Sequence, residues 1–203
     1  MHISEGFLTP QVLAAGWAAA SLGVAVGLKK MEPERTVRVA VMSSAFFLAS
    51  LVNVRIGPVS THLALIAPTG LILGWASFPA VMIALLLQAL FFQFGGLTVL
   101  GVNTLDMALP ALAAYLCFAR MVRTGSPVVS GLAAFVAGAA AVLLGAALLS
   151  LFLVASDPGM MGAARVAFAT HLPLALIEGV VTLFFAAFLR RVAPDLLSGA
   201  GRA

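Results

Sequence analysis

The stretch SPVVSGLAAFVAGAAAVLLGAALLSLFLVA, residues 126–155, contains no Asp, Glu, Lys, Arg or His. A helix needs about 20 mainly apolar residues to cross a lipid bilayer, and this stretch exceeds that length. The rest of the chain has the same character, with 63% hydrophobic residues, 9% charged residues and a mean hydropathy of +1.15. Soluble domains average roughly half apolar and a quarter charged residues. The chain is therefore predicted to be an integral membrane protein built as an all-α helix bundle.

Apolar stretches recur along the chain, and we expect them to form one membrane domain over residues 1–203. Six lie near residues 11–28, 36–54, 79–94, 104–122, 126–155 and 164–189, and a shorter seventh covers residues 63–76. Glycines at positions 131, 138 and 145 recur every seven residues, and Gly23 and Gly27 form a G-x-x-x-G. Small residues at such spacings let helices approach closely, so both sets are predicted to form helix contacts.

The basic residues predict how the chain crosses the cell membrane. With about seven transmembrane helices and the amino terminus outside, nine of the eleven Lys and Arg residues fall on the cytoplasmic side, as the positive-inside rule requires. These nine are Lys29, Lys30, Arg35, Arg38, Arg120, Arg123, Arg190, Arg191 and Arg202, and only Arg55 and Arg165 fall outside. The carboxyl terminus is then cytoplasmic. His2, His62 and His171 all map to the outer half.

The first two residues, Met1 and His2, are candidates for a metal chelator. The α-amine of Met1, the deprotonated backbone nitrogen of His2 and a ring nitrogen of His2 can close two fused rings around one divalent ion. One position in the plane remains, and His62, which follows the loop of residues 53–61, could fill it. Such all-nitrogen planar geometry suits Ni²⁺ or Cu²⁺, admits Co²⁺, and suits Mg²⁺, Ca²⁺ and Mn²⁺ poorly. The alternatives are that His2 is there by chance and that His62 only bridges two helices by a hydrogen bond.

His171 and Glu178 are further ionisable residues in an apolar stretch, where such residues are candidates for function. They are seven residues apart, so they share one helical face about two turns apart. That separation is too long for both to bind one metal ion without another element between them. We expect His171 to support a site or to pack, and Glu178 to be a buried carboxylate that needs a partner.

Several classes of function are disfavoured by the sequence. It has no G-x-x-x-x-G-K-[ST] motif for nucleotide hydrolysis and no H-E-x-x-H motif for a zinc protease. The basic residues form no run interleaved with aromatic residues, so nucleic acid is not an expected partner. A chain of this kind that concentrates a scarce metal would need energy from elsewhere, and a partner ATPase is the favoured source.

Three segments carry a resemblance to a known family. The opening Met1-His2-Ile3-Ser4-Glu5-Gly6-Phe7-Leu8, the run Gln88-Ala89-Leu90 followed by Gly95-Gly96-Leu97-Thr98-Val99-Leu100-Gly101-Val102-Asn103, and His171-Leu172 with Glu178-Gly179 and Pro194-Asp195-Leu196 span nearly the whole chain. They resemble the substrate-binding membrane components of energy-coupling-factor transporters for cobalt and nickel, a class of ABC transporter. The match at His62 is looser, because the family's loop often reads G-x-S-x-H.

The resemblance implies a transporter subunit that is not itself an enzyme. It implies that Met1, His2 and His62 bind Ni²⁺ or Co²⁺ as substrate through four nitrogens, and that the segment from Gly95 to Asn103 closes over the amino terminus. Asn103, His171 and Glu178 are then candidates to support the ligands without binding the metal. The implied partners are a transmembrane coupling protein, cytoplasmic ATPases and a small accessory membrane protein.

Two other functions stay open. A vitamin-type substrate component would use an apolar and aromatic outer cavity in place of the nitrogen ligands. A membrane metallohydrolase would need an open metal position and a general base, and the sequence specifies no such base.

Overall fold

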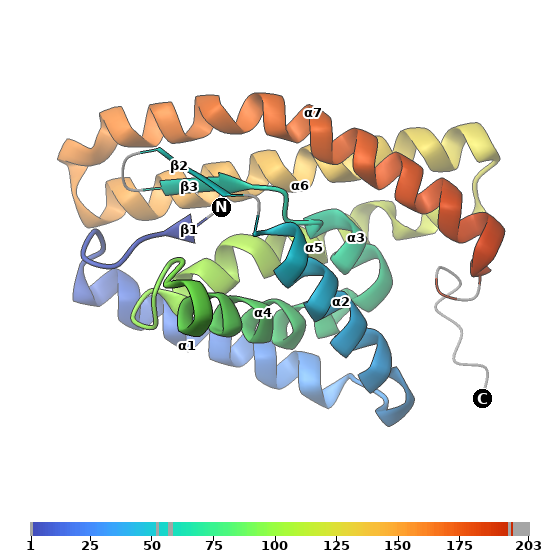
Figure 1. Cartoon of the computed structure of the whole chain (residues 1–203), viewed down its shortest axis with the longest axis horizontal. Coiled ribbons are helices and arrows are strands. Elements are labelled where there is room, and N and C mark those ends of the chain that lie inside the picture. Colours follow the sequence, from blue (N-terminus) through green and yellow to red (C-terminus); the bar gives the residue numbers. More distant parts are fainter. Residues whose placement is uncertain (1, 52, 57–58, 195, 197–203) are drawn as a thin grey trace.

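A computed structural model describes residues 2–51, 53–56, 59–194 and 196 of the chain (Figure 1). Helices account for most of this part. The helical elements are α1 (Pro10–Lys29), η1 (Pro33–Arg35), α2 (Thr36–Ala49), α3 (Ile66–Leu73), η2 (Gly74–Ala76), α4 (Ser77–Phe92), α5 (Leu100–Thr124), α6 (Pro127–Ser156), η3 (Pro158–Met160) and α7 (Met161–Val192).

Five helical segments within the described residues are long and apolar enough to cross a membrane. They are Pro10–Lys29, Ile66–Phe92, Leu100–Thr124, Pro127–Ser156 and Pro158–Val192. Two of the seven predicted spans are shorter than expected, because α2 has 14 residues and α3 has eight. The predicted span of residues 36–54 is wrong at its end, since α2 stops at Ala49 and residues 53–56 form a strand.

The longest helices, α6 and α7, lie side by side and run in opposite directions (Figure 1). A short connection that contains η3 joins them, and Asp157 Oδ1 accepts the backbone N–H of Gly159 at 2.8 Å. The helices meet closely at Gly138, where an added Cβ would lie 2.5 Å from the Glu178 carbonyl oxygen. The two helices can approach this closely because Gly138 has no side chain. The prediction that this glycine forms a helix contact is confirmed.

A short helix and a break precede α4. Gly74 has φ +56 and ψ −122, a conformation that only glycine adopts readily, and it ends α3 as the first residue of η2. The next residue is Trp75, and its carbonyl oxygen would lie only 2.6 Å from a Cβ added to Gly27 of α1. The glycines of the predicted G-x-x-x-G motif in α1 thus contact the segment η2–α4. The break explains why residues 63–76 do not form one continuous span.

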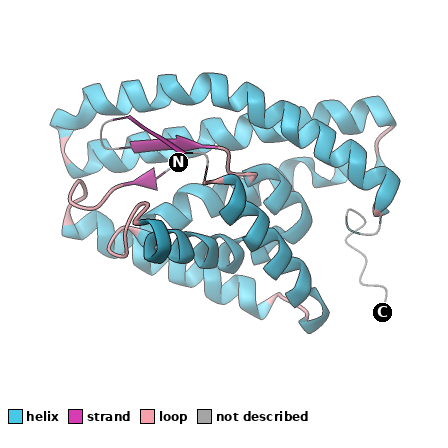
Figure 2. Cartoon of the chain, in the orientation of Figure 1, coloured by secondary structure: helices cyan, strands magenta, loops and turns pink. Residues whose placement is uncertain are grey.

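A three-stranded antiparallel sheet joins the amino terminus to the segment before α3 (Figure 2). Its strands β1 (His2–Ile3), β2 (Asn53–Ile56) and β3 (Val59–His62) are ordered β1-β3-β2. The register pairs His2 with Ser60 and Asn53 with His62. The helical part of the all-α prediction is confirmed, but that prediction did not include this sheet. The predicted loop of residues 53–61 is wrong where residues 53–56 and 59–61 lie in strands, and His62 ends the second of these strands.

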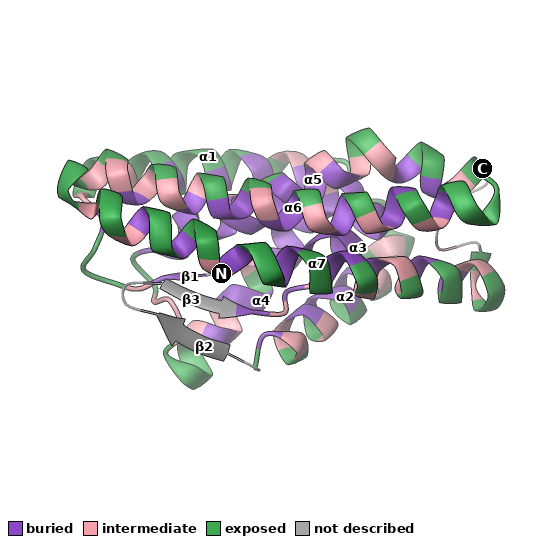
Figure 3. Cartoon of the chain, turned by 90° about the horizontal axis from the view of Figure 1, so that it is seen from above, coloured by how far each residue is buried: buried purple, intermediate pink, exposed green. Residues whose placement is uncertain are grey.

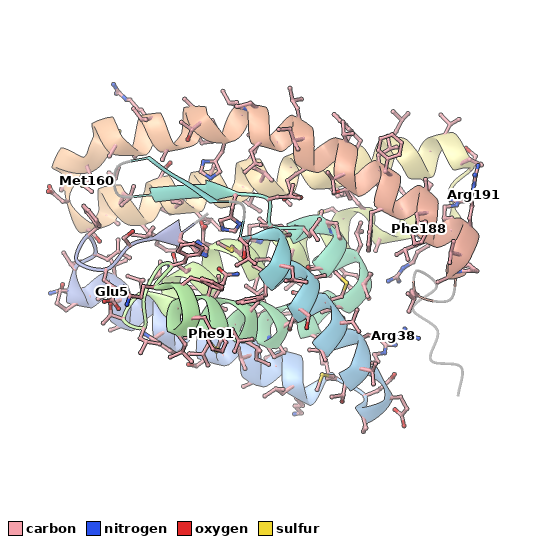
Figure 4. All side chains as sticks on the ribbon, viewed as in Figure 1. Glu5, Arg38, Phe91, Met160, Phe188 and Arg191 are labelled. Carbon is pink, nitrogen blue, oxygen red and sulfur yellow. The ribbon has the colours of Figure 1, made fainter. Side chains whose placement is uncertain are left out.

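The two ends of the bundle differ in charge (Figure 4). Arg38 and Arg191 lie near one end, whereas Glu5 and Met160 lie near the other.

Large apolar side chains are exposed along the sides, among them Leu22, Val128 and Phe184 at 67–70% exposure (Figure 3). Arg202 and the side chain of Arg55 are not in the described part. The direction in which the bundle faces across a membrane remains a prediction.

Candidate functional site

The rings of His2 and His62 lie against each other beside the sheet. Strand β1 carries His2 and the adjacent strand β3 ends at His62, which is how residues 60 positions apart meet. His2 Nδ1 and His62 Nε2 are separated by 3.2 Å, and the ring centroids by 4.5 Å. Both side chains are almost fully buried, at 1% and 2% exposure.

In each ring, the nitrogen that points away from the other histidine has a hydrogen-bond partner. This partner determines which ring nitrogen carries the hydrogen when the ring is neutral. His2 Nε2 lies 2.7 Å from Gln88 Oε1, and His62 Nδ1 lies 3.0 Å from the Leu63 carbonyl oxygen. Both oxygens can only accept, so these two ring nitrogens carry the hydrogens in the neutral rings. The nitrogens that face each other, His2 Nδ1 and His62 Nε2, therefore present lone pairs. Two lone pairs at this distance repel each other unless a proton or a metal ion lies between them.

Burial keeps His62 neutral. Loss of hydration lowers the pKa of its ring well below the ordinary value of 6.5. A neutral imidazole is the form that binds a metal ion, so no proton has to leave His62 before binding at neutral pH.

Asn103 fixes the strand that carries His2. Its side chain accepts the backbone N–H of Ile3 at 2.9 Å and donates to the Ile3 carbonyl oxygen at 3.0 Å. The amide thus extends β1 as another strand would, although it comes from the first turn of α5. Asn103 is one of the supporting residues that the resemblance implies, and in the structure it bonds the residue after His2.

The glycine-rich segment before α5 covers the same site. Gly95 has φ +74, and a Cβ placed on it would lie 3.0 Å from Asn103 Nδ2 and 3.8 Å from the Cβ of His2. Glu5 Oε1 accepts the backbone N–H of Thr98 at 3.0 Å and its hydroxyl at 3.2 Å. These two bonds hold the pKa of Glu5 below its usual value. The segment is therefore tied to the amino-terminal residues both by close packing and by hydrogen bonds.

Glu178 supports the backbone that follows His62. One of its oxygens, Oε1, accepts the N–H of Ala64 at 2.6 Å and the N–H of Leu65 at 2.9 Å. Leu65 has φ +51, which is unusual for a residue other than glycine. The carboxylate thus holds the chain in a strained turn between β3 and α3. The sequence predicted that a buried Glu178 needs a partner, and Oε1 has one in these two backbone N–H groups.

His171 is close to this region but does not join the pair of histidines. Its Nδ1 lies 2.6 Å from the Ala167 carbonyl oxygen one turn earlier in α7, and its Nε2 is buried with no hydrogen-bond partner among the described residues. Asp106 of α5 is also fully buried, and neither of its oxygens has a partner in the described part. The sequence suggested that Asp106 lies near the outer face, either to attract a cation or as a solvated or capping carboxylate, and its full burial excludes a solvated one. Gln88 entered only through its place in the run that resembles the known family, although a polar residue within an apolar span is a signal that singles it out.

The geometry of the histidine pair fits a metal ion with planar ligands. Metal to imidazole nitrogen bonds of about 2.0–2.1 Å place neighbouring nitrogens in a square plane roughly 2.9 Å apart. The observed separation of 3.2 Å is close to that spacing. Met1 lies outside the described residues, and no group of three or more His, Cys, Asp or Glu residues able to hold a metal occurs in the described part.

Comparisons with known proteins place these features in a family. A family model described as the cobalt uptake substrate-specific transmembrane region matches residues 2–196. A Haemophilus influenzae protein named for metal transport is 36% identical over 98% of this chain and 97% of its own length. The cobalt transport protein CbiM of Chlorobium limicola is 31% identical over 99% of this chain and 85% of its own. The fused nickel transport protein NikMN of Rhodobacter capsulatus is 33% identical, and the match covers 98% of this chain but 64% of that protein.

Solved structures agree with the family match. Crystal structures of a transition metal transporter and of a truncated transition metal transporter each share 26% identity with this chain. The truncated protein aligns with a TM-score of 0.72 over 94% of this chain and 99% of its own, and the other with 0.71 over 95% and 93%.

Proposed function

Because the chain belongs to the cobalt-uptake substrate-specific transmembrane family, we propose that it is the substrate-binding component of an energy-coupling-factor transporter for Ni²⁺ or Co²⁺. It is a multi-pass membrane protein, with five helical segments in its described part that can cross a bilayer. The ion is the cargo, captured at the end of the bundle opposite the basic residues. Partner proteins then supply the energy that moves it inward.

The proposed ligands are four nitrogens. His2 Nδ1 and His62 Nε2 supply two of them, and the backbone nitrogen of His2 and the α-amine of Met1 supply the others. A chelate from an amino-terminal residue and the next histidine uses Nδ1, because that nitrogen closes a six-membered ring with the backbone nitrogen. The Gln88 contact at His2 Nε2 leaves this same nitrogen without a proton.

One observation carries the proposal: two buried imidazole nitrogens, His2 Nδ1 and His62 Nε2, face each other at 3.2 Å. Two such nitrogens can share one cation between them. Nitrogen ligands in a plane suit nickel, and cobalt accepts them as well. Both metals occur in the names of similar proteins.

Metal content and thermal stability of the purified protein test the ligand set. The protein with a free amino terminus is exposed to Ni²⁺, Co²⁺, Cu²⁺ and Zn²⁺, alongside His2→Ala, His62→Ala and, as a matched histidine control, His171→Ala. We expect one equivalent of nickel or cobalt, lost in the first two variants and kept in the third. A protein blocked at its amino terminus should also bind nothing, since an amide cannot replace the amine. Full affinity in the blocked protein would exclude the Met1 amine.

Transport needs a separate test because the chain has no P-loop of its own. The proposed partners are a transmembrane coupling protein, cytoplasmic ATPases and a small accessory membrane protein. Vesicles that contain the whole assembly should accumulate metal when ATP is supplied, and vesicles with this chain alone should not. ATP-independent uptake by the chain alone would refute the dependence on an ATPase.

The alternatives raised by the sequence have weaker support. A vitamin-type component would not require two buried histidines whose rings contact each other. A metallohydrolase needs an open metal position, which a complete set of four planar nitrogens does not leave. Metal-dependent stabilisation without turnover would favour the proposed transporter component over both.

A further inference from the structure

The basic end of the bundle contains a cavity of about 220 Å³, far from the histidine pair. It lies where α1 ends, where η1 and η2 turn, and where α5 approaches its end. Its charged and aromatic lining consists of Lys30, Arg35, Trp75, Tyr115 and Arg123. Three cations around one small cavity make it a site for an anion.

Two of these cations have no acidic partner in the part of the chain that the structure describes. Among the described residues, Lys30 and Arg123 form no ion pair, whereas Arg35 is paired with Glu32 at 2.9 Å. The Arg123 guanidinium has five N–H donors, and its one hydrogen bond in the described part is from Nη2 to the Leu71 carbonyl oxygen at 3.2 Å. Positive charge and donor capacity thus remain available at the cavity.

Aromatic rings hold the two unpaired cations in place. Lys30 Nζ lies 4.4 Å from the centre of the Trp75 ring, and the Arg123 guanidinium lies 5.3 Å from the centre of the Tyr115 ring. Both distances are in the range of cation–π attraction. Such contacts orient the cations without neutralising them, which lowers the entropy lost when an anion binds.

The surroundings of the cavity match the headgroup region of a membrane. Tryptophan and tyrosine are enriched at membrane–water interfaces, and basic pockets between membrane helices bind anionic lipid headgroups. Guanidinium and ammonium groups are the usual partners of phosphate in proteins. We propose that this basic cavity binds the phosphate headgroup of an anionic phospholipid. The inference is independent of the metal site and requires only that this end of the bundle lie at a membrane surface.

A second basic cavity nearby does not offer the same chemistry. It is lined by Arg190 and Arg191, but Arg190 Nη1 donates to the Val122 and Gly125 carbonyl oxygens at 3.3 and 2.9 Å. That guanidinium is occupied in capping the end of α5. The cavity at Lys30 is therefore the stronger candidate.

Lipid retention by the purified full chain tests the proposal. Native mass spectrometry and thermal unfolding are measured with phosphatidylglycerol, with phosphatidylcholine of the same acyl chains, and with inorganic phosphate. We expect phosphatidylglycerol to be retained and to stabilise the protein more than the other two. Lys30→Gln should weaken its binding by about fivefold, the effect of one cation at a membrane surface. Lys30→Arg should restore the binding.

The neighbouring lysine provides a matched control. Lys29 is also exposed but does not line the cavity, so Lys29→Gln should leave phosphatidylglycerol binding unchanged. Equal losses in Lys29→Gln and Lys30→Gln would overturn the proposal, because general surface charge would then explain the binding. Equal retention of phosphatidylcholine would also overturn it. Equal stabilisation by inorganic phosphate would show a site for free phosphate and refute the lipid assignment.

Discussion

Glu178 Oε1 lies 2.6 Å from the backbone nitrogen of Ala64, a hydrogen bond between the middle of α7 and the segment that follows His62. The same oxygen accepts from Leu65, so one carboxylate oxygen organises the turn on which the direction of the His62 ring depends. We infer that Glu178 positions His62, a proposed ligand, through the backbone of Ala64 and Leu65. Residues that support metal ligands in this way typically contribute 10–100-fold to affinity.

Removing this support should weaken metal binding. Glu178→Ala is expected to lower nickel or cobalt affinity by about 10–100-fold, and Glu178→Gln by less, because an amide oxygen can still accept. Titration of the purified variants with metal measures the change. The control is Thr182→Val, one turn further along α7, where the hydroxyl only bonds the Glu178 carbonyl oxygen. Equal loss in the control would indicate general damage to α7 instead of a role at His62.

Gln88 should determine which ring nitrogen of His2 carries the hydrogen and therefore which one is free to bind the metal. In Gln88→Leu the His2 ring is free to place its hydrogen on Nδ1, and affinity should fall by about tenfold or more. Gln88→Glu keeps an acceptor 2.7 Å from Nε2 and should bind metal at least as well. Calorimetric titration with the metal that the unmodified protein binds gives both values. Gln11→Leu on the exposed side of α1 controls for the loss of an amide. Unchanged affinity in Gln88→Leu would contradict the tautomer argument.

Two glycines offer a matched test of the segment over the site. Gly95→Ala places a side chain at φ +74 and 3.0 Å from Asn103 Nδ2, which costs about 1–3 kcal/mol in the closed arrangement. We expect metal to leave this variant faster, as followed by transfer to a chelator. Gly162→Ala has open space around it and lies in the first turn of α7, so its release rate should not change. The same rate in both variants would show that the segment does not retain the metal.

The metal-free protein should lose stability as the pH falls. In the unfolded chain His62 takes up a proton below its ordinary pKa of 6.5, whereas the folded ring, with its lowered pKa, does not. The unfolded state then binds more protons, so stability rises with pH and is lost progressively as the pH drops below 6.5 towards the lowered folded value. Apparent Tm values between pH 7.5 and 5.5 should therefore decline. The decline should be smaller in His62→Gln, and equal declines would rule His62 out as the cause.

The helices could be predicted from the sequence because a bilayer-spanning helix needs only a long apolar run. Residues 126–155 were predicted as one span and form α6 (Pro127–Ser156). Residues 63–76 were predicted as a short span of their own, broken or tilted, but the position of the break at Gly74 could not be located in this way. An apolar run continues through residues 63–92 with no charge to mark where one helix ends, and the break depends on one positive φ beside Tyr115.

The sheet escaped prediction for a different reason. Strand β1 has two residues, too few for an alternating pattern, and its partner β3 is more than 50 residues away. The chemistry of Met1, His2 and His62 still indicated that the amino terminus and the segment before α3 should meet. It could not indicate that Gln88 bonds His2, because an amide in an apolar span can be singled out from the sequence but its partner cannot. Met1 as a ligand stays a prediction, as do the roles of His171 and the orientation in the membrane.

Strand β1 has a consequence for the order of events during synthesis. Residues 2 and 3 leave the ribosome well before the partners of His2 and Ile3, because Gln88 and Asn103 lie 86 and 100 residues further along the chain. The turn after His62 waits longer still, for Glu178, 114 residues beyond Ala64. A nascent or truncated chain that stops before α7 therefore has both histidines but lacks Glu178, whose hydrogen bonds hold the turn after His62. The site is completed late in synthesis, when nearly the whole bundle has been made.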